Sequence, residues 1–420
     1  MTTTMSSQQR SLTRTEIAGL PIRQLAEEFG TPLYVFDAEV IRRQVANFAA
    51  FDVIRYAQKA YSNLSLLRLM RSQGVLLDAV SAGEVLRALK AGFQPQADPP
   101  EIVYTADIFD REALDVVAKY GLHVNCGSRD MLDQLAERMG GQEITLRINP
   151  GFGHGHSQKT NTGGEQSKHG IWHEELEDTL AQAARLGHTV TGIHCHIGSG
   201  NDLEHLSQVC GAMKDLALRV GPGLKAISAG GGISIPYRDD QQPVDTAAYF
   251  GLWNTARREL EQEFGHPLRL EIEPGRYLVA EAGFLVTEIR AVKRMGNNDF
   301  YLVDAGFNNL ARPILYGAYH PMSIDAASPK KGTQPVVIGG PLCESGDIFT
   351  QDEEGFVDKR ELPQAAVGDF LTIECAGAYG SVMGSNYNSK PLAAEVLIDG
   401  GQAELVRRRQ TFEEMIQCEE

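Results

Sequence analysis

A regular alternation of short apolar runs and amphipathic stretches constrains the fold of this chain more than any other feature. Eight runs rich in β-branched or apolar residues follow one another within about 220 residues, and stretches of helical length separate them. Several of these stretches end at a glycine, which favours a helix C-terminus. We expect the runs to be the parallel strands of a closed (β/α)8 barrel, with an open doubly wound sheet as the alternative. The runs span residues 53–60, 75–81, 102–106, 123–128, 143–149, 189–197, 226–233 and 268–275.

The pattern changes after about residue 277. Later strand-like runs are separated by turn residues, and several alternate apolar with polar residues as half-buried antiparallel strands do. The 420 residues also exceed the size, about 300 residues, at which a single hydrophobic core stops growing. We therefore predict an α/β protein with a barrel at residues 40–280 and a second, mostly antiparallel β domain of the sandwich or barrel type from residues 1–39 and 281–420. The strand-like runs outside the barrel are residues 32–37, 284–292, 299–306, 334–341, 369–377 and 393–400.

Charge and composition restrict the partners of the chain. The formal net charge of −16 is unfavourable for a polyanion partner, because nucleic-acid binding requires clustered Lys and Arg side chains. We find neither an apolar run near the roughly 20 residues of a membrane helix nor the apolar segment of a signal peptide. The six cysteines lie far apart without a CxxC pair, which suits reduced thiols. We expect a cytoplasmic protein with a small-molecule substrate and no nucleic-acid or membrane partner.

Residues suited to chemistry gather at the expected carboxyl ends of the barrel strands, where such barrels carry their function. The triple glycine at 230–232 would let backbone N–H groups approach an anion, and the loops after the last two strands of a barrel often bind phosphate. Glycine-rich turns can also simply cap strands. The neighbouring segment EPGR favours phosphate, because its arginine offers a charged fork. Other side chains at these ends are Lys59, Asp78, Ser81, Arg147, His194 and His196.

Two interpretations of Lys59 are open. A lysine ammonium is costly to bury on an apolar strand, so Lys59 is either solvated at the strand end or neutralised by imine formation with a carbonyl cofactor. Glu273 favours the second, because a carboxylate there could keep a pyridine nitrogen protonated and make the ring a strong electron sink. The alternative for Glu273 is an ordinary salt bridge to a neighbouring arginine.

A metal site is the main rival interpretation. His194 and His196 are two residues apart on a strand and would point to one face, and His154 and His156 could join them around zinc. This would make the chain a metal-dependent barrel hydrolase. Because the sequence has no HExxH motif and the phosphate-type glycines would be unused, we expect no metal.

The second domain carries candidate substrate-binding residues. Cys343 and Glu344 lie in a glycine-rich turn, although a lone cysteine is more often an inert small hydrophobe. Arg312 and Tyr316 have a spacing that would place both on one side of a helical turn, suited to a carboxylate, with ordinary surface placement as the alternative. Tyr379 lies among small residues. The insertion at 150–170 has the length of a working loop.

Six segments together resemble the diaminopimelate decarboxylase family. This family lies within the barrel-fold group of pyridoxal-phosphate-dependent decarboxylases that includes ornithine and arginine decarboxylases and is related in fold to alanine racemase. The segments keep the family's order and approximate spacing over nearly the whole chain, which is far more specific than any single motif. The insertion looks similar to that of the proteobacterial branch. The six segments are YAQKA, HCHIGSG, SAGGG, EPGR, GPLCESGD and AGAYG.

The resemblance implies pyridoxal 5′-phosphate as the cofactor and assigns residues to it. Lys59 would be the Schiff-base lysine, His196 would stack on the pyridine ring, and Glu273 would pair with the pyridine nitrogen. Further cofactor contacts would come from Asp78, Ser199, Gly231, Gly232, Gly275, Arg276 and Tyr379.

The resemblance also implies the reaction and the assembly. The D-configured carbon of meso-2,6-diaminopimelate would lose its carboxylate to give L-lysine, the last step of lysine biosynthesis, with Cys343 as the proton donor. Members of the group are homodimers in which the barrel of one subunit and the CESGD segment of the other share an active site. The substrate contacts would be Arg276, Arg312, Tyr316, Glu344 and Tyr379.

Three alternatives to this function stay open at this point. The substrate could be another diamino acid of the ornithine, lysine or arginine type, because these substrates differ mainly in what the distal pocket accepts. The chain could also be a metal-dependent barrel hydrolase or a noncatalytic carrier of pyridoxal phosphate. One departure from relatives is the pair Glu374-Cys375, where an Asp commonly precedes AGAYG, and we expect only a local effect.

Overall fold

The computed structural model describes residues 10–152, 163–196, 202–352 and 354–420. Contacts divide the chain into two compact units. The barrel unit contains Arg43–Ser234 and Pro243–Leu278, and the β unit contains Met1–Arg42, Ile235–Gln242 and Val279–Glu420. The segment Ile235–Gln242 therefore belongs to the β unit, although it lies inside the range that we assigned to the barrel.

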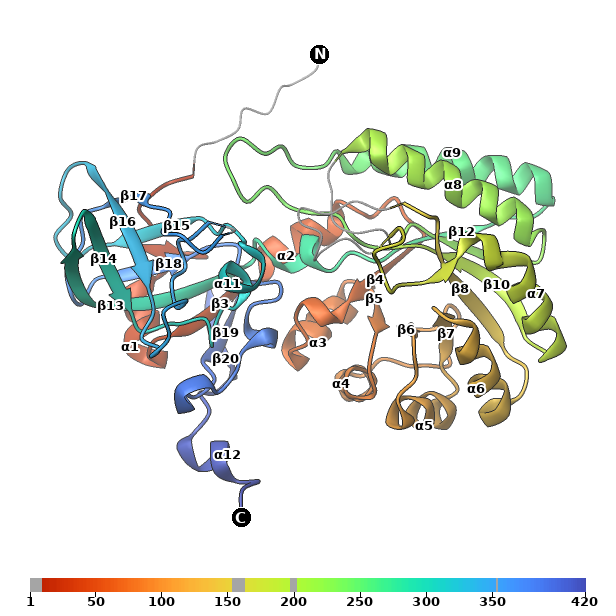
Figure 1. Ribbon diagram of the computed structural model, residues 1–420, viewed down its shortest axis with the longest axis horizontal. Coiled ribbons are helices and arrows are strands. Elements are labelled where there is room, and N and C mark those ends of the chain that lie inside the picture. Colours follow the sequence, from red (N-terminus) through yellow and green to blue (C-terminus); the bar gives the residue numbers. More distant parts are fainter. Residues whose placement is uncertain (1–9, 153–162, 197–201, 353) are drawn as a thin grey trace. The chain divides into compact units, whose positions relative to one another are not determined.

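Within the described residues, eight parallel strands close into a barrel, as predicted (Figure 1). Each strand pairs with the next in chain order, β10 pairs with β8, and β12 pairs with β4 to complete the ring. An open doubly wound sheet is therefore wrong. A short strand, β9 (Ile171–Trp172), pairs in parallel with the carboxyl end of β8. The barrel strands are β4 (Val53–Ala57), β5 (Leu76–Ala79), β6 (Ile102–Ala106), β7 (His123–Cys126), β8 (Glu143–Asn149), β10 (Thr189–His194), β11 (Ala226–Ser228) and β12 (Arg269–Ile272).

Local capping explains why the helices between these strands begin and end where they do. Side chains of Ser81 and Asp110 accept hydrogen bonds from the first turns of α4 and α5, at 3.2 Å and 2.7 Å. Gly92 and Gly121 end the same helices in the left-handed conformation that glycine adopts without strain. Long helices α8 and α9 lie side by side on the outside of the barrel (Figure 1). The barrel-unit helices are α3 (Leu64–Ser72), α4 (Ala82–Ala91), α5 (Arg111–Tyr120), α6 (Arg129–Met139), α7 (Leu176–Arg185), α8 (Leu203–Val220) and α9 (Thr246–Phe264).

The β unit is a mixed but mostly antiparallel sheet structure, as predicted. Strand β3 comes from the N-terminal part of the chain and lies between β13, its antiparallel neighbour, and β19, its parallel neighbour. Five of its strands, β1, β2, β15, β17 and β20, had no counterpart in our prediction. The strands are β1 (Glu16–Ile17), β2 (Leu20–Pro21), β3 (Leu33–Asp37), β13 (Gly283–Met295), β14 (Asn298–Val303), β15 (Met322–Asp325), β16 (Thr333–Gly339), β17 (Arg360–Pro363), β18 (Phe370–Ile373), β19 (Ala394–Asp399) and β20 (Gln402–Arg407).

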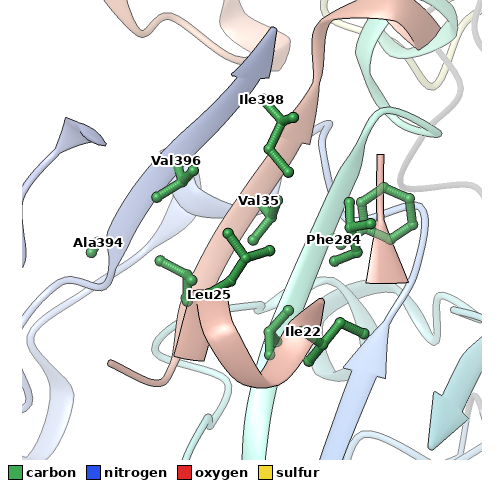
Figure 2. Packing of buried hydrophobic residues seen from close by; sticks show 10 residues of the cluster. Ile22, Leu25, Val35, Phe284, Ala394, Val396 and Ile398 are labelled. Carbon is green, nitrogen blue, oxygen red and sulfur yellow. The ribbon is translucent and has the colours of Figure 1, made fainter. Parts of the chain in front are cut away.

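The core of the β unit gathers where helix α1 (Ile22–Phe29) covers one face of this sheet. Ile22 and Leu25 of the helix pack against Val35, Phe284 and Val396, which come from three adjacent strands (Figure 2). Burying one such side chain contributes about 1.5–3 kcal/mol, so this contact fixes β3 in the sheet. Further helices are α2 (Ala38–Ala46), α10 (Arg276–Val279), α11 (Arg312–Tyr316) and α12 (Phe412–Ile416).

Two further findings concern the helices and the cysteines. In the part of the chain that the structure describes, none of the helices has both the length and the apolar character needed to cross a membrane. All six cysteines lie in the described ranges and are free.

Candidate active site

Lys59 does not lie on a barrel strand. Strand β4 ends at Ala57, and Lys59 lies in the following short 3-10 helix, Gln58–Ala60, with its side chain exposed. The side chain of Gln58 donates to the backbone O of Glu84 at 3.1 Å and so anchors this turn to α4. The strand does not reach Lys59 as we expected, because it ends two residues earlier. The amine instead lies in a place that a cofactor can reach.

A cavity of about 840 Å³ lies at Lys59 within the barrel unit. Its lining mixes charges of both signs, so a polar and ionic ligand suits it better than an apolar one. The lining residues include Lys59, Asp107, Asp110, Arg147, Lys168 and His169.

Glu273 is buried just beyond β12 and both of its oxygens accept hydrogen bonds. Nε2 of His194 donates to Oε2 at 2.6 Å, and the hydroxyl of Ser228 donates to Oε1 at 3.2 Å. Burial by itself raises the pKa of Glu273, but the charge and hydrogen bond of His194 together with the charge of Arg55 offset it, and the pKa lies below its ordinary value. A carboxylate held in this way stays negatively charged inside the barrel, as a partner for a protonated pyridine nitrogen must.

Asp78 of β5 is a second buried carboxyl group near Glu273. Burial, followed by the negative charge of Glu273, raises the pKa of Asp78 to about 8. Its Oδ1 has no hydrogen-bond partner among the residues that the structure describes. Asp78 therefore differs from Glu273 in holding its proton at neutral pH, and its orphaned oxygen offers one place where a bound polar group would fit.

The turn after β11 brings the backbone close to His196. The N–H of Gly231 donates to Nδ1 of His196 at 3.1 Å, so the ring accepts at Nδ1. A Cβ at position 231 would lie 2.4 Å from the backbone O of Glu273 and 2.9 Å from Cε1 of His196, which leaves room for glycine only. Burial and the positive charge of Lys59 lower the pKa of His196 well below its ordinary value. His196 is thus a neutral ring held in a fixed orientation.

The other predicted cofactor residues are distributed between the two units. Gly232 has a φ of 96° in the glycine turn, Gly275 packs against Ala57, and Arg276 begins α10. Tyr379 belongs to the β unit, and Ser199, like His154 and His156, lies outside the described residues. A lysine at a polar cavity, an anionic buried carboxylate, an orphaned carboxyl oxygen and a glycine turn beside a neutral ring together fit pyridoxal phosphate.

The base of the long insertion also contributes to this cavity, which our sequence analysis missed. Asp107 follows β6 and accepts a hydrogen bond from the N–H of Gly170 at 2.8 Å, and it also contacts the imidazole of His169. Nη1 of Arg147 lies 3.9 Å from Asp107. The available signal was the position of Asp107, one residue beyond a barrel strand.

In the β unit, Arg312 and Tyr316 lie at the two ends of α11, the helical turn that their spacing predicted. Arg312 is buried and Tyr316 is half-buried. Nη1 of Arg312 donates to Nε2 of His320 at 2.8 Å. Surface placement is therefore wrong for Arg312.

Cys343 and Glu344 lie in an exposed turn of the β unit. Asp347 shapes this turn by accepting hydrogen bonds from the N–H groups of Leu342 and Phe307, both at 2.8 Å. The N–H of Cys343 donates to Oδ1 of Asn388 at 2.7 Å. The fixed turn therefore presents the thiol to the surroundings rather than to the core.

In the residues that the structure describes, His, Cys, Asp and Glu side chains form no group of three or more that could hold a metal ion. His194 and His196 instead contact Glu273 and Gly231.

Comparison with known proteins identifies the class first. Residues 38–280 match the family described as "Pyridoxal-dependent decarboxylase, pyridoxal binding domain". The fold and the site therefore define a barrel-fold decarboxylase that uses pyridoxal phosphate.

Similar proteins show which family within this class the chain belongs to. A diaminopimelate decarboxylase of Escherichia coli K12 is 54% identical over 411 residues, which cover 97% of this chain and 98% of the relative. A crystal structure of diaminopimelate decarboxylase superposes with a TM-score of 0.91 at 55% identity and covers 94% of this chain and 95% of that one. The Helicobacter pylori diaminopimelate decarboxylase complexed with L-lysine is 31% identical, with a TM-score of 0.83 and coverage of 94% and 98%. The chain belongs to the diaminopimelate decarboxylase family.

Proposed function

We propose that this chain removes CO2 from meso-2,6-diaminopimelate to give L-lysine, with pyridoxal phosphate bound at Lys59. The observation that carries this proposal is the buried anionic Glu273, held by His194 and Ser228 in the same barrel as the accessible Lys59. Identity of 54% to a diaminopimelate decarboxylase over almost the whole chain favours this substrate over other diamino acids.

Each residue around the cofactor has a separate task in this proposal. Lys59 holds the cofactor covalently through Nζ, and Glu273 keeps the ring nitrogen protonated. When bound, pyridoxal phosphate would supply an electron-accepting ring for the electrons of the scissile bond. His196 packs on the ring as a neutral imidazole, because its Nδ1 is occupied by the N–H of Gly231. The remaining contacts are assigned to Asp78, Ser199, Gly231, Gly232, Gly275, Arg276 and Tyr379.

Residues of the β unit bind and protonate the substrate. Arg312 binds a substrate carboxylate, and Cys343 donates the proton of its thiol to the carbon that has lost CO2. Tyr316, Glu344 and Tyr379 of the same unit and Arg276 of the barrel unit complete the substrate contacts. Cys343 is suited to this task because its turn is fixed by Asp347 while its side chain is exposed.

We further propose a homodimer in which the exposed Cys343 turn completes the active site of the partner subunit. Exposed apolar side chains of the same unit, which a monomer would leave in water, support this assembly. They include Ile314, Leu315 and Tyr387, and the hydroxyl of Tyr387 lies 3.5 Å from Glu344. We place the enzyme in the cytoplasm, which its six free cysteines support. We also propose that residues 40–280 form its cofactor-binding domain.

The experiment that tests this function compares CO2 release from meso-diaminopimelate, L-lysine, L-ornithine and L-arginine by the purified holoenzyme. We expect release from meso-diaminopimelate with L-lysine as the product, and a K59A variant that lacks the borohydride-sensitive visible absorbance of the holoenzyme. Release from another amino acid alone, or a normal absorbance band in K59A, would contradict the proposal. A chelator should leave the activity unchanged.

A further inference from the structure

Arg312 and His320 form a buried pair whose hydrogen bonds are chemically determined. Nη1 of Arg312 lies 2.8 Å from Nε2 of His320, and Nδ1 of His320 lies 3.0 Å from the backbone O of Glu374. The residues are only 6% and 2% exposed. A guanidinium can only donate, so Nε2 of His320 must accept. A carbonyl can only accept, so Nδ1 must carry the ring proton. His320 is therefore a neutral imidazole of one defined tautomer.

The acceptor of the ring proton is itself fixed. The N–H of Glu374 donates to the backbone O of Pro321 at 2.8 Å, and its carboxylate accepts from Nε of Arg14 and from the hydroxyl of Ser323, both at 2.9 Å. The carbonyl that receives the His320 proton therefore has little freedom to move. Because the imidazole is hydrogen-bonded to this fixed carbonyl, it restricts the position of the Arg312 guanidinium in turn.

In addition to the hydrogen bond with His320, a contact with Tyr237 restricts the orientation of the Arg312 guanidinium. The Arg312 guanidinium carbon lies over the Tyr237 ring, 5.0 Å from its centroid, and the same ring packs edge-to-face on His320 at 5.6 Å. One N–H of Arg312 thus points at an imidazole nitrogen while a face of the group rests on an aromatic ring. These two contacts define the plane of the guanidinium, and planarity is what makes arginine a specific carboxylate binder.

We infer that His320 is a positioning residue for the substrate: it holds Arg312, through a neutral Nδ1–H tautomer, in the orientation that binds a substrate carboxylate. The inference rests on the proposed role of Arg312 in decarboxylation. His320 acts on binding, because it touches neither the cofactor nor the reacting carbon in this scheme. It should therefore govern KM much more than kcat.

Three variants of the holoenzyme test this inference. H320F keeps an aromatic ring but removes both hydrogen bonds. H320Q offers a carbonyl oxygen to Arg312 and an amide N–H to the Glu374 carbonyl. H188F is the matched control, because His188 is also buried with both ring nitrogens engaged, at Gln142 and Leu132, but lies in the barrel unit away from the proposed substrate contacts.

We expect H320F to raise KM for meso-diaminopimelate by roughly ten- to hundredfold, the range of a lost charge-assisted hydrogen bond, with kcat within about threefold of wild type. H320Q should keep KM within about threefold of wild type, and H188F should leave KM unchanged. The absorbance of bound cofactor and the melting temperature are recorded for every variant to show that it is folded and loaded.

A folded, loaded H320F with normal KM would overturn the inference, and so would an equal rise of KM in H320F and H320Q. If H320F does not fold, H320M replaces it, since methionine fills a similar space without a donor. Failure of both to fold while H320Q folds would assign His320 a structural role and also overturn the inference. Failure of the proposed function is distinguishable, because the wild-type enzyme would then release no CO2 from meso-diaminopimelate.

Discussion

The carboxyl groups of Asp78 and Glu273 are buried in the same barrel, and the negative charge of Glu273 helps to keep Asp78 protonated. Glu273 accepts hydrogen bonds from His194 and Ser228, and its pKa is lowered despite burial. Burial and the charge of Glu273 raise the pKa of Asp78 from 3.8 to about 8. In the barrel, Glu273 thus carries a negative charge while Asp78 carries a proton. This difference in protonation can be measured.

Replacing Asp78 with Asn should stabilise the cofactor-free protein at pH 7 and leave it unchanged near pH 4. Between 3.8 and about 8 the unfolded chain releases a proton that the folded chain retains, so wild-type stability falls as the pH rises through this range. D78N lacks this loss, so its free energy of unfolding at pH 7 should exceed that of the wild type by about 2–4 kcal/mol. Urea unfolding at several pH values measures the difference. D215N, at an exposed aspartate of α8, is the control, and a gain independent of pH would contradict the assignment.

Replacing His194 with Phe should raise the pKa of Glu273, because both the charge and the hydrogen bond of His194 lower it. Glu273 would then keep its proton to a higher pH, and in the protonated form it could no longer hold the cofactor nitrogen. We expect cofactor affinity and kcat to fall by roughly ten- to hundredfold, toward the values of E273Q. Titration of the apoprotein with pyridoxal phosphate, followed by absorbance, checks this. Wild-type affinity in a folded H194F would refute the role.

Removing Arg55 should destabilise the fold without affecting substrate binding. Nε of Arg55 lies 2.6 Å from Oε2 of Glu271, both groups are buried, and Arg269 reaches the other oxygen at 2.6 Å. Although burial raises the pKa of Glu271, Arg55 and Arg269 lower it to about 2 overall. The stabilisation is present above the ordinary value of 4.5 and is lost as the pH falls toward 2.

We therefore expect R55M to reduce the free energy of unfolding by about 3 kcal/mol at pH 7. The reduction should become smaller as the pH approaches 3. Urea unfolding measures this loss, and an unchanged KM shows that the site is intact. R138A is the control, because its pair with Asp115 is exposed on both sides and should contribute less than about 1 kcal/mol. Equal losses in the two variants would contradict the argument.

Mixing two inactive variants should restore activity if subunits share active sites. K59A lacks the cofactor attachment and C343A lacks the proton donor. When the subunits exchange, about half of the dimers are mixed and each has one intact site of two, which gives about a quarter of wild-type activity. Decarboxylation after co-incubation measures the recovery, and each variant incubated alone is the control. No recovery despite subunit exchange would show that each site is built within one chain.

Local sequence signals predicted the barrel well, because strand and helix periods are local properties. The runs at 102–106 and 143–149 match β6 and β8 at both ends. The predicted run at 53–60 extends beyond β4, because the sequence does not mark where the strand stops and the short helix that carries Lys59 begins. The pairing of Arg312 with His320 depends on the turn at Gly317, and that of Asp107 with His169 joins distant segments of the chain. Such contacts depend on tertiary packing and leave no periodic trace in the sequence.

Strand β3 has a consequence for the order in which the nascent protein can mature. It lies near the start of the chain, but its neighbours in the sheet, β13 and β19, begin at Gly283 and Ala394. During synthesis the whole barrel sequence leaves the ribosome before β13 and β19 have been made. The barrel can therefore fold while both edges of β3 are still unpaired. The β unit can only be completed after β19 has emerged.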